Sequence, residues 1–444
     1  MGVFLLFACH GMDAAAMAVE PAATADAIDQ QEAGKFVAWL KNNRAPDLGV
    51  PYSHVGDPRF EHWSITYDAA IAALAYLAVD EVPAARKILD TYIDTAQLWR
   101  LGGVVEAFMG EHPLRVVDWS VRSGANIWLA NASLRCYQKT GEDRYLVLAR
   151  RIMDLMLSLQ DQRSDSPNSG GVALGPAGDS VYPTDQHIGY DPGMPHFKDI
   201  YATEINIDAY TMFRLLARST GEAKYTQAAQ GCLKWLSHNA WNREEHRFDR
   251  GFRDKAVATD VQSWGISALG VEGLDSLEPG LAEKIAYFIE SRCLSSVSYD
   301  KPGVGRVPVK GVDFVDKGRL AELGRGPLVS FEWTFQLANA YLRLEHDLAR
   351  QGKTEKALAY RRKRAELLSQ LVAAASPSDG GLAFPYATEA EALIGHEYRT
   401  PLSGNFSAIG AAYAVLALRG YDPLDIDEPV WENISSGGRA YADK

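Results

Sequence analysis

Two stretches of this sequence share one pattern. Residues 127–145 read IWLANASLRCYQKTGEDRY, and residues 208–225 read DAYTMFRLLARSTGEAKY. In each stretch a helical pattern rich in apolar residues runs into Thr-Gly-Glu-x-x-Tyr, where the glycine ends one helix and the following residues begin the next. The shared turn predicts that both stretches belong to helical hairpins of the same design.

The hairpin recurs along the rest of the chain. Its first helix is apolar on almost every side, which is typical of a helix buried on both faces, and its second helix is apolar on one face only. Residues 407–418 form a first helix without a second, and residues 27–42 form a second helix without a first, so pairing these two closes a ring. The other pairs fall at residues 67–77 with 83–93, 261–269 with 281–292, and 332–344 with 354–374.

Six hairpins of this kind predict an all-α fold, the (α/α)6 toroid, in which six outer helices surround six inner ones. We expect a single toroid domain over residues 28–430, with a leader over residues 1–27 and a tail over residues 431–444. An open helical solenoid is the alternative. The first helices begin at unevenly spaced positions, which argues against a solenoid with a fixed repeat length.

The leader has features of an export signal. Residues 3–8, VFLLFA, are apolar but far fewer than the roughly 20 residues that span a bilayer. Ala16-Met17-Ala18 offers a small-x-small cleavage site, although no Lys or Arg precedes the apolar run. Residues 6–9, LFAC, resemble a lipoprotein box, which would place a lipid anchor on Cys9. We therefore expect an exported protein, periplasmic or lipid-anchored, and keep a cytoplasmic protein with a disordered leader as the alternative.

Charge and motif content argue against several function classes. The net charge is −12 and no run of Lys and Arg offsets it, so the protein repels the phosphates of a nucleic acid. The four Cys form no CxxC pair, and the ten His include no HExxH motif. GxGxxG, P-loop and GxSxG motifs are absent as well. The sequence therefore predicts no metal, no cofactor and no nucleic-acid partner.

The connections between helices are of two kinds. Turns within a hairpin are short, whereas connections between hairpins are long and rich in Gly, Pro, Asp and aromatic residues at 160–203, 294–330 and 377–404. In a closed toroid all inner helices run in the same direction, so the long connections and the starts of the inner helices gather at one face. Long connections in a compact domain are usually functional, and we expect a bowl-shaped cleft at that face.

Five of the six inner-helix starts carry a carboxylate, and several have a tryptophan beside it. Cleavage of a glycosidic bond needs an acid that protonates the leaving oxygen and a carboxylate that activates water or attacks the sugar. Glu204 and Asp208 stand four residues apart on one helix face, and Asp208 lies too deep for a helix cap. The predicted catalytic carboxylates are Glu204, Asp208 and Asp260, followed by Asp68, Asp118 and Glu332. The predicted sugar contacts are Trp119, Arg122, Trp264 and Trp333, with His187 and Tyr190 from the connection at 160–203.

Polar residues at helix starts also have a purely structural explanation. Asp, Ser and Thr are common N-caps, and carboxylates in the first turn complement the helix dipole. Thr259-x-x-Gln262 reads as a capping box, in which the two side chains satisfy the free N–H groups of the first turn. Capping is therefore the alternative for each of these residues taken alone.

Three segments carry a resemblance to a known group of proteins. They are TEINIDAY at 203–210, TDVQSW at 259–264 and FEWT at 331–334. Together with the hairpin pattern over about residues 60–425, they resemble the six-hairpin glycosidase superfamily. The resemblance implies a glycoside hydrolase that acts on an oligo- or polysaccharide, in most members with inversion, through carboxylates at the mouth of the toroid. It does not extend to a particular glycosidase family.

Related toroids house other activities, and three alternatives stay open. A sugar epimerase is expected to place His residues in the bowl, and the inner-helix starts contain none. A non-catalytic toroid would bind a glycan or a protein partner in an envelope or exopolysaccharide system. A uronate-specific polysaccharide lyase would use Tyr and His, and a locally basic connection would meet the acidic sugar. That connection carries Lys310, Lys317, Arg319 and Arg325, for which a solvated loop is the simpler explanation.

Overall fold

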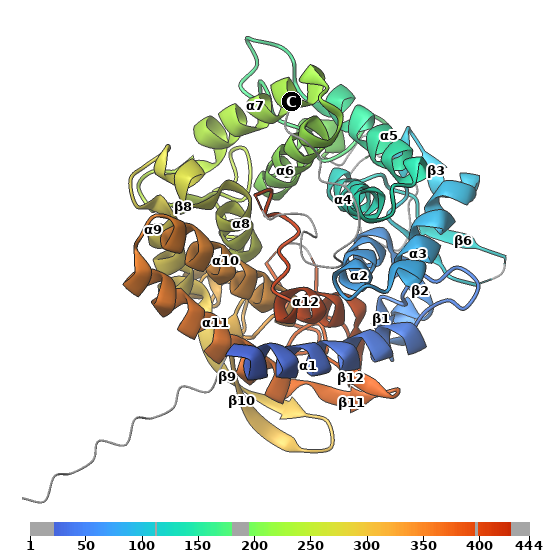
Figure 1. Ribbon diagram of the computed structural model, residues 1–444, viewed down its shortest axis with the longest axis vertical. Helices are drawn as coiled ribbons and strands as arrows, with labels where there is room; N and C mark the ends of the chain where they lie inside the picture. The colour runs from blue at the N-terminus through green and yellow to red at the C-terminus, as the bar shows by residue number, and fades with distance from the viewer. Residues whose placement is uncertain (1–21, 112, 180–194, 396–397, 428–444) are drawn as a thin grey trace, which may run out of the picture.

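In the computed structural model, residues 22–111, 113–179, 195–395 and 398–427 are described, and their α-helices form two concentric rings (Figure 1). The inner helices are α2 (Thr66–Ala78), α4 (Ser123–Thr140), α6 (Thr203–Thr220), α8 (Thr259–Asp275), α10 (Phe331–Arg350) and α12 (Ala408–Leu418). The outer helices are α3 (Val82–Asp94), α5 (Asp143–Leu159), α7 (Ala223–Trp235), α9 (Leu281–Phe288), α11 (Thr354–Ala374) and α1 (Ala22–Asn42). The predicted (α/α)6 toroid is confirmed.

The ring closes where the sequence pattern requires it to close. Helix α1 packs against α12, so the first outer helix completes the last hairpin. Helix α1 begins at Ala22, five residues earlier than the pattern indicates, and thus extends into the expected leader. Most of that leader, with Cys9, and the whole expected tail lie outside the described residues. The domain bounds 28–430 stay a prediction.

Burial explains why the two rings differ in composition. Every residue of α12, AIGAAYAVLAL, is buried, because this helix has the outer ring on one side and its inner neighbours on the other. Outer helix α5 buries one face only, through Tyr145, Leu148, Ile152 and Met156, which recur at helical spacing. Within the described residues, no helix combines the length and the hydropathy needed to cross a membrane.

The repeated Thr-Gly-Glu turn joins an inner helix to its outer partner. Gly141 and Gly221 follow α4 and α6 with φ of +73° and +71°, a left-handed conformation that glycine adopts without strain. The tyrosine of the motif then reaches the preceding hairpin. Tyr145 donates a hydrogen bond to Asp90 at 3.0 Å, and Tyr225 donates one to Asp154 at 3.1 Å. The motif therefore fixes both the hairpin and its neighbour in the outer ring.

Polar side chains near the starts of the inner helices bind the backbone of the preceding linker. The amides of Asn126, Asn206 and Gln262 each donate to and accept from the backbone of one linker residue, which is Val104, Val172 and Phe248 in turn. The predicted capping box at Thr259-x-x-Gln262 is therefore wrong. The side chain of Gln262 binds the linker, and the N-cap position of α8 is held by Ala258, which makes no side-chain capping bond.

The linkers contain short strands that the helical pattern does not indicate. An antiparallel sheet has the order β2 (Trp63–Ile65), β5 (Ala107–Met109) and β6 (Arg115–Asp118), and β2 leads directly into α2. The connection at 294–330 begins with a hairpin of β9 (Leu294–Lys301) and β10 (Gly305–Val312) that projects beyond the rings in Figure 1. The remaining pairs are β1 (His54–Val55) with β13 (Phe406–Ser407), β3 (Trp99–Arg100) with β4 (Gly103–Val104), β7 (Trp241–Asn242) with β8 (Arg247–Phe248), and β11 (Ser376–Ser378) with β12 (Gly381–Ala383).

The segment after α12 closes the end of the toroid where the inner helices finish. In Figure 1 this red segment runs back across the middle of the ring. Asn131 of α4 donates to the carbonyl of Pro423 at 3.1 Å, and Arg218 of α6 donates to the carbonyl of Ile426 at 2.9 Å. Across the ring from α4, Arg343 of α10 forms an ion pair with Asp425, so residues 421–427 are held from both sides and form a floor beneath the bore.

Candidate functional site

The starts of the inner helices surround a cavity of about 630 Å³. Small-molecule sites usually have volumes of about 300–1,000 Å³, so this cavity is large enough for a ligand. All six inner helices contribute lining residues, and so do the linkers that precede them. The cavity lies at the end opposite the floor, which is the face where the sequence predicts a cleft.

The predicted carboxylates converge on this cavity. Those that line it are Asp68 of α2, Asp118 at the end of β6, Glu204 and Asp208 of α6, Asp260 of α8 and Glu332 of α10. Three of the predicted sugar contacts, Arg122, Trp264 and Trp333, line it as well. The direction of the inner helices brings together residues that are far apart in the sequence, while the role of each residue stays a prediction.

One predicted sugar contact lies elsewhere. Trp119 is not among the lining residues; it packs against the hydrophobic core, and its carbonyl accepts a hydrogen bond from Arg100 at 3.2 Å. Successive side chains of extended backbone point to opposite sides, so with Asp118 directed into the cavity its neighbour points away. Trp119 is thus placed outside the lining of this cavity, and its role as a sugar contact stays a prediction. His187 and Tyr190 lie outside the described residues.

Two of the lining carboxylates, Asp208 and Glu332, do not bind the free N–H groups of a helix start, whereas Oδ1 of Asp260 accepts the backbone N–H of Val261 at 2.8 Å. Asp208 accepts a hydrogen bond from the indole of Trp128 at 3.0 Å, and its second oxygen, Oδ1, has no hydrogen-bond partner. Glu332 accepts from Tyr67 at 2.9 Å and from Gln336 at 3.0 Å. Helix α10 is capped instead by Ser330, whose side chain accepts the N–H of Trp333. Capping therefore does not account for Asp208 and Glu332, while Asp260 satisfies one N–H of the first turn of α8.

Burial raises the pKa of most of these carboxyl groups and so favours their protonated form. The pKa of Asp68 rises to about 7 and that of Glu332 to about 8, in both cases mainly because burial disfavours the charged form. The pKa values of Asp208 and Asp260 lie well above the ordinary range, through burial and through the nearby charge of Glu204. Several acids therefore stand in the cavity in their neutral form at pH values where a free carboxyl is ionised.

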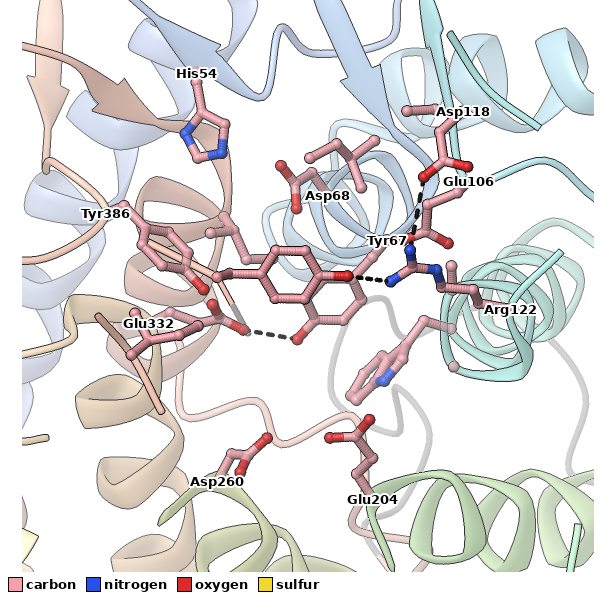
Figure 2. Close-up of a pocket in the computed structure, with 18 of the residues that line it drawn as sticks. His54, Tyr67, Asp68, Glu106, Asp118, Arg122, Glu204, Asp260, Glu332 and Tyr386 are labelled. Carbon is pink, nitrogen blue, oxygen red and sulfur yellow. Dashed lines mark hydrogen bonds and ion pairs between the residues drawn. The ribbon is translucent and has the colours of Figure 1, made fainter. Parts of the chain in front are cut away.

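Arg122 places a positive charge at one side of the cavity. Its Nη2 lies 3.7 Å from Asp118 Oδ2, and its Nη1 donates to the hydroxyl of Tyr398 at 3.0 Å (Figure 2). Burial raises the pKa of Glu204, while the charges of Arg250 and Arg122 oppose that rise. On one side of the cavity the charges of cations thus oppose the effect of burial on the carboxyl groups, and burial remains the largest cause of the raised pKa values.

Aromatic rings complete the wall. Trp128 lies with its ring centroid 5.4 Å from that of Trp264 and packs edge-on against Tyr67 at 5.9 Å. Trp333 packs against Phe314 at 4.8 Å. These contacts hold flat apolar surfaces beside the carboxylates, and Tyr and Trp offer a hydrogen-bonding group as well as an apolar face.

Some lining residues do not belong to the inner-helix starts and are therefore not predicted from the sequence. Glu106 belongs to the linker before α4, its pKa rises to about 7 through burial, and its Oε2 has no hydrogen-bond partner. The length of that linker, residues 95–122, is the signal that could have pointed to it. His54, Tyr386, Tyr398 and Arg399 come from two other linkers (Figure 2 labels the first two), and only the tertiary structure brings them to the cavity.

The basic connection expected for a lyase does not reach the cavity. Lys310 pairs with Glu366 at 3.3 Å, Lys317 donates to the carbonyl of Ser291 and Arg325 forms an ion pair with Asp313. These residues and Arg319 are absent from the cavity lining. Across the described ranges, no three His, Cys, Asp or Glu side chains are arranged so as to hold a metal ion.

Comparison with known proteins identifies relatives of the fold only. No family model and no curated protein sequence matches the chain. A solved structure of a glycoside hydrolase family 76 α-1,6-mannanase from Salegentibacter sp. HEL1_6, an inactive variant in complex with α-1,6-mannotetrose, is similar with a TM-score of 0.55 and 12% identity, over 88% of this chain and 98% of that chain.

Two further structures show the breadth of the likeness. Cellobiose 2-epimerase from Bacillus thermoamylovorans B4167 has a TM-score of 0.57 and 11% identity, over 89% of this chain and 99% of that chain. A family 76 mannosidase from Bacteroides thetaiotaomicron VPI-5482 has a TM-score of 0.54 and 10% identity, over 88% and 97%. The neighbours are toroids of the six-hairpin glycosidase superfamily, and this chain has their fold. Fold alone does not determine the activity.

Proposed function

We propose that the protein is a glycoside hydrolase that cleaves an oligo- or polysaccharide in the cavity of the toroid. The observation that carries the proposal is the convergence of carboxyl groups from the inner-helix starts on one cavity, with indole rings beside them. These are the two components that glycosidic bond cleavage uses, an acid paired with a carboxylate and surfaces that stack on pyranose rings.

The electrostatics of the cavity support a division of roles. We assign the general acid to Asp260, because burial and the charge of Glu204 raise its pKa well above the ordinary range and so favour the protonated form. We assign the base or nucleophile to Glu204, because the charges of Arg250 and Arg122 oppose the rise in pKa that burial causes. In Figure 2 the carboxyl groups of Glu204 and Asp260 both point into the cavity, from α6 and α8.

The remaining carboxylates have supporting roles in this scheme. Asp208 is only 1% exposed and is bound by the indole of Trp128, so it lies behind the reacting groups. Burial raises the pKa of Asp208, and the nearby charges of Glu204 and Asp260 raise it further. Asp68 and Glu332 face the cavity from α2 and α10, where a sugar hydroxyl could donate to them.

The substrate need not be that of the family 76 neighbours. The mannanase variant named above is described as inactive with two aspartates at consecutive positions replaced. The present sequence contains no two consecutive aspartates. The pair of consecutive aspartates named for that mannanase has no counterpart as such a pair in this chain, and α-1,6-mannan is one candidate substrate among several.

A sugar epimerase is the second candidate, because the cavity wall contains a buried histidine. His54 is 8% exposed, burial lowers its pKa to about 4, and its Nδ1 has no hydrogen-bond partner. A neutral imidazole of this kind can accept a proton from a sugar carbon or hydroxyl. The single histidine among the described lining residues stands beside seven carboxyl groups, which favours the hydrolase.

The proposal is tested by incubating the protein with α-1,6-mannan, β-glucans, xylan and uronate polymers, and with their oligosaccharides. We expect new reducing ends from the parent protein and a loss of about 10²–10⁴-fold in rate for Glu204→Gln and Asp260→Asn. Glu355→Gln, at an exposed position of α11, is the matched control and should retain full activity.

The other outcomes identify the alternatives. An isomerised sugar without new reducing ends, lost in His54→Gln, would identify an epimerase. A product that absorbs in the near ultraviolet would identify a lyase, and glycan binding without any turnover would identify a non-catalytic toroid. Export and a lipid anchor at Cys9 stay predictions from the leader.

A further inference from the structure

The connection between β12 and β13, at the mouth of the cavity, reaches across the toroid. It starts beside α10, where Ala387 forms a β-bridge with Ser330. It ends beside α2, where the backbone N–H of Leu402 donates to Asp57 at 2.9 Å. The described residues between these two points contact elements on other sides of the ring.

Three arginines mark the path of this connection. Arg325, which precedes α10, donates to the carbonyl of Leu393. Arg250 donates to the carbonyl of Gly395 at 3.3 Å. Arg250 itself lies beside the start of α6, because its carbonyl accepts the N–H of Thr203. Arg122, which precedes α4, donates to the hydroxyl of Tyr398. Leu393 and Arg399 form an antiparallel β-bridge, so the connection is a hairpin whose two ends lie near α10 and α2. Because its far end contacts Arg250 and Arg122 near α6 and α4, on the other side of the ring in Figure 1, the hairpin extends over the mouth.

The same connection supplies part of the cavity wall. Tyr386, Ile394, Tyr398, Arg399 and Pro401 all line the cavity. At the other end of the bore, residues 421–427 form the floor described above, and Arg343 of α10 holds that segment through ion pairs with Asp425 and Asp427. The cavity is therefore bounded below by one segment and crossed above by another.

We propose that this blind cavity acts on a chain end or a short oligosaccharide and excludes the interior of a polysaccharide, with the connection between β12 and β13 as the excluding element. This inference rests on the proposed hydrolase function. A polysaccharide cut in its interior must enter a site and leave it again on the other side, which requires an open groove. A chain end enters a blind cavity and needs a single opening.

The test compares products over time on linear oligosaccharides of two to eight units and on the matching polymer, taken from the series on which the protein is active. We expect one small product from the earliest time points, oligosaccharides that shorten stepwise, and a polymer whose viscosity stays nearly constant while reducing ends accumulate. A ladder of intermediate lengths at the first time points, with an early fall in viscosity, would overturn the inference and leave the hydrolase intact. Absence of turnover on every substrate would overturn the hydrolase and the inference together.

A loop variant tests which element excludes the polymer. A short Gly-Ser linker replaces residues 389–401, and the matched control replaces residues 302–304 at the exposed tip of the β9–β10 hairpin. We expect the loop variant, but not the control, to release intermediate lengths from the polymer. A cooperative unfolding transition would show that the loop variant is folded. If the folded variant still releases only the terminal product, the connection is not the element that excludes the polymer. If the variant does not fold, the product pattern of the parent protein alone decides the inference.

Discussion

The hydroxyl of Tyr67 donates a hydrogen bond to Oε1 of Glu332 across 2.9 Å, and this bond joins α2 to α10 inside the cavity. The same hydroxyl lies 3.1 Å from that of Tyr413 on α12. Three inner helices that come from distant parts of the sequence thus meet at one carboxyl group. The bond stabilises the ionised form of Glu332 and opposes the burial that raises the pKa of this carboxyl to about 8.

Replacing Tyr67 by Phe should raise the pKa of Glu332 further. The variant removes a hydrogen bond to the carboxylate, which is worth about 1 kcal/mol, and this corresponds to a rise on the order of one pKa unit. A ¹³C NMR titration of protein labelled at Glu carboxyl carbons measures the value directly. Tyr287→Phe, at an exposed position on α9, is the control. An unchanged or lowered pKa in Tyr67→Phe would contradict the role assigned to the bond.

The buried acids should make the protein less stable as the pH rises. Folding raises the pKa of Asp68 from its ordinary 3.8 to about 7, so between these pH values the folded chain holds a proton that the unfolded chain releases. The free energy of unfolding therefore falls through this window and stays reduced above it. Glu106 and Glu332, with pKa values of about 7 and about 8, act in the same direction.

Asp68→Asn should remove this penalty. We expect the variant to gain roughly 2 kcal/mol in the free energy of unfolding at pH 8 and to differ little from the parent at pH 4. Urea unfolding at the two pH values measures both, with Asp300→Asn at an exposed position of β9 as the control. A loss of stability at pH 8 would show that the ionised carboxylate has a stabilising partner.

Arg343 should be essential to the floor of the toroid. It is 4% exposed and forms ion pairs with Asp347, Asp425 and Asp427. Arg343→Met leaves the buried carboxylate of Asp425 without a cation, and we expect a loss of about 3–5 kcal/mol in the free energy of unfolding. Asp347 keeps its ion pair with Arg350, and Asp427 is half-exposed. Lys224→Met, which breaks a half-exposed pair with Asp154, should cost less than about 1 kcal/mol. Equal losses in the two variants would show that the buried ion pairs contribute no more to the free energy of unfolding than the half-exposed pair.

The floor also depends on a glycine inside α8. Gly270 has φ of +62°, and a Cβ atom there would lie 2.4 Å from Nη2 of Arg343 and 2.6 Å from Oδ2 of Asp347. Gly270→Ala therefore meets both backbone strain and a steric clash, and we expect a loss of more than 1 kcal/mol. Gly34→Ala in α1, with nothing within 4 Å of the added atom, should be neutral or stabilising. Thermal unfolding of both variants gives the comparison, and equal midpoints would count against the clash.

The helices and the carboxylates at their starts follow from local sequence. Helical periodicity, the glycine turn at Gly141 and Gly221, and the contrast between all-apolar and one-sided helices depend on neighbours a few residues away. Because closing the ring aligns all inner helices in one direction, the positions of Asp68, Glu204, Asp260 and Glu332 at one face follow from the repeat itself. The sequence therefore determines the toroid fold and the face at which the carboxylates of the cavity gather.

The linkers are determined only in the tertiary structure. Glu106 reaches the cavity and Trp119 turns away from it because the linker before α4 pairs with β2 in a sheet, and such pairing depends on residues far apart along the chain. The same holds for Tyr398, which contacts Arg122 from a connection near the other end of the sequence. Local sequence patterns do not predict contacts between backbone segments that are far apart along the chain. Long-range packing therefore decides the walls of this site, the connection over its mouth and its floor.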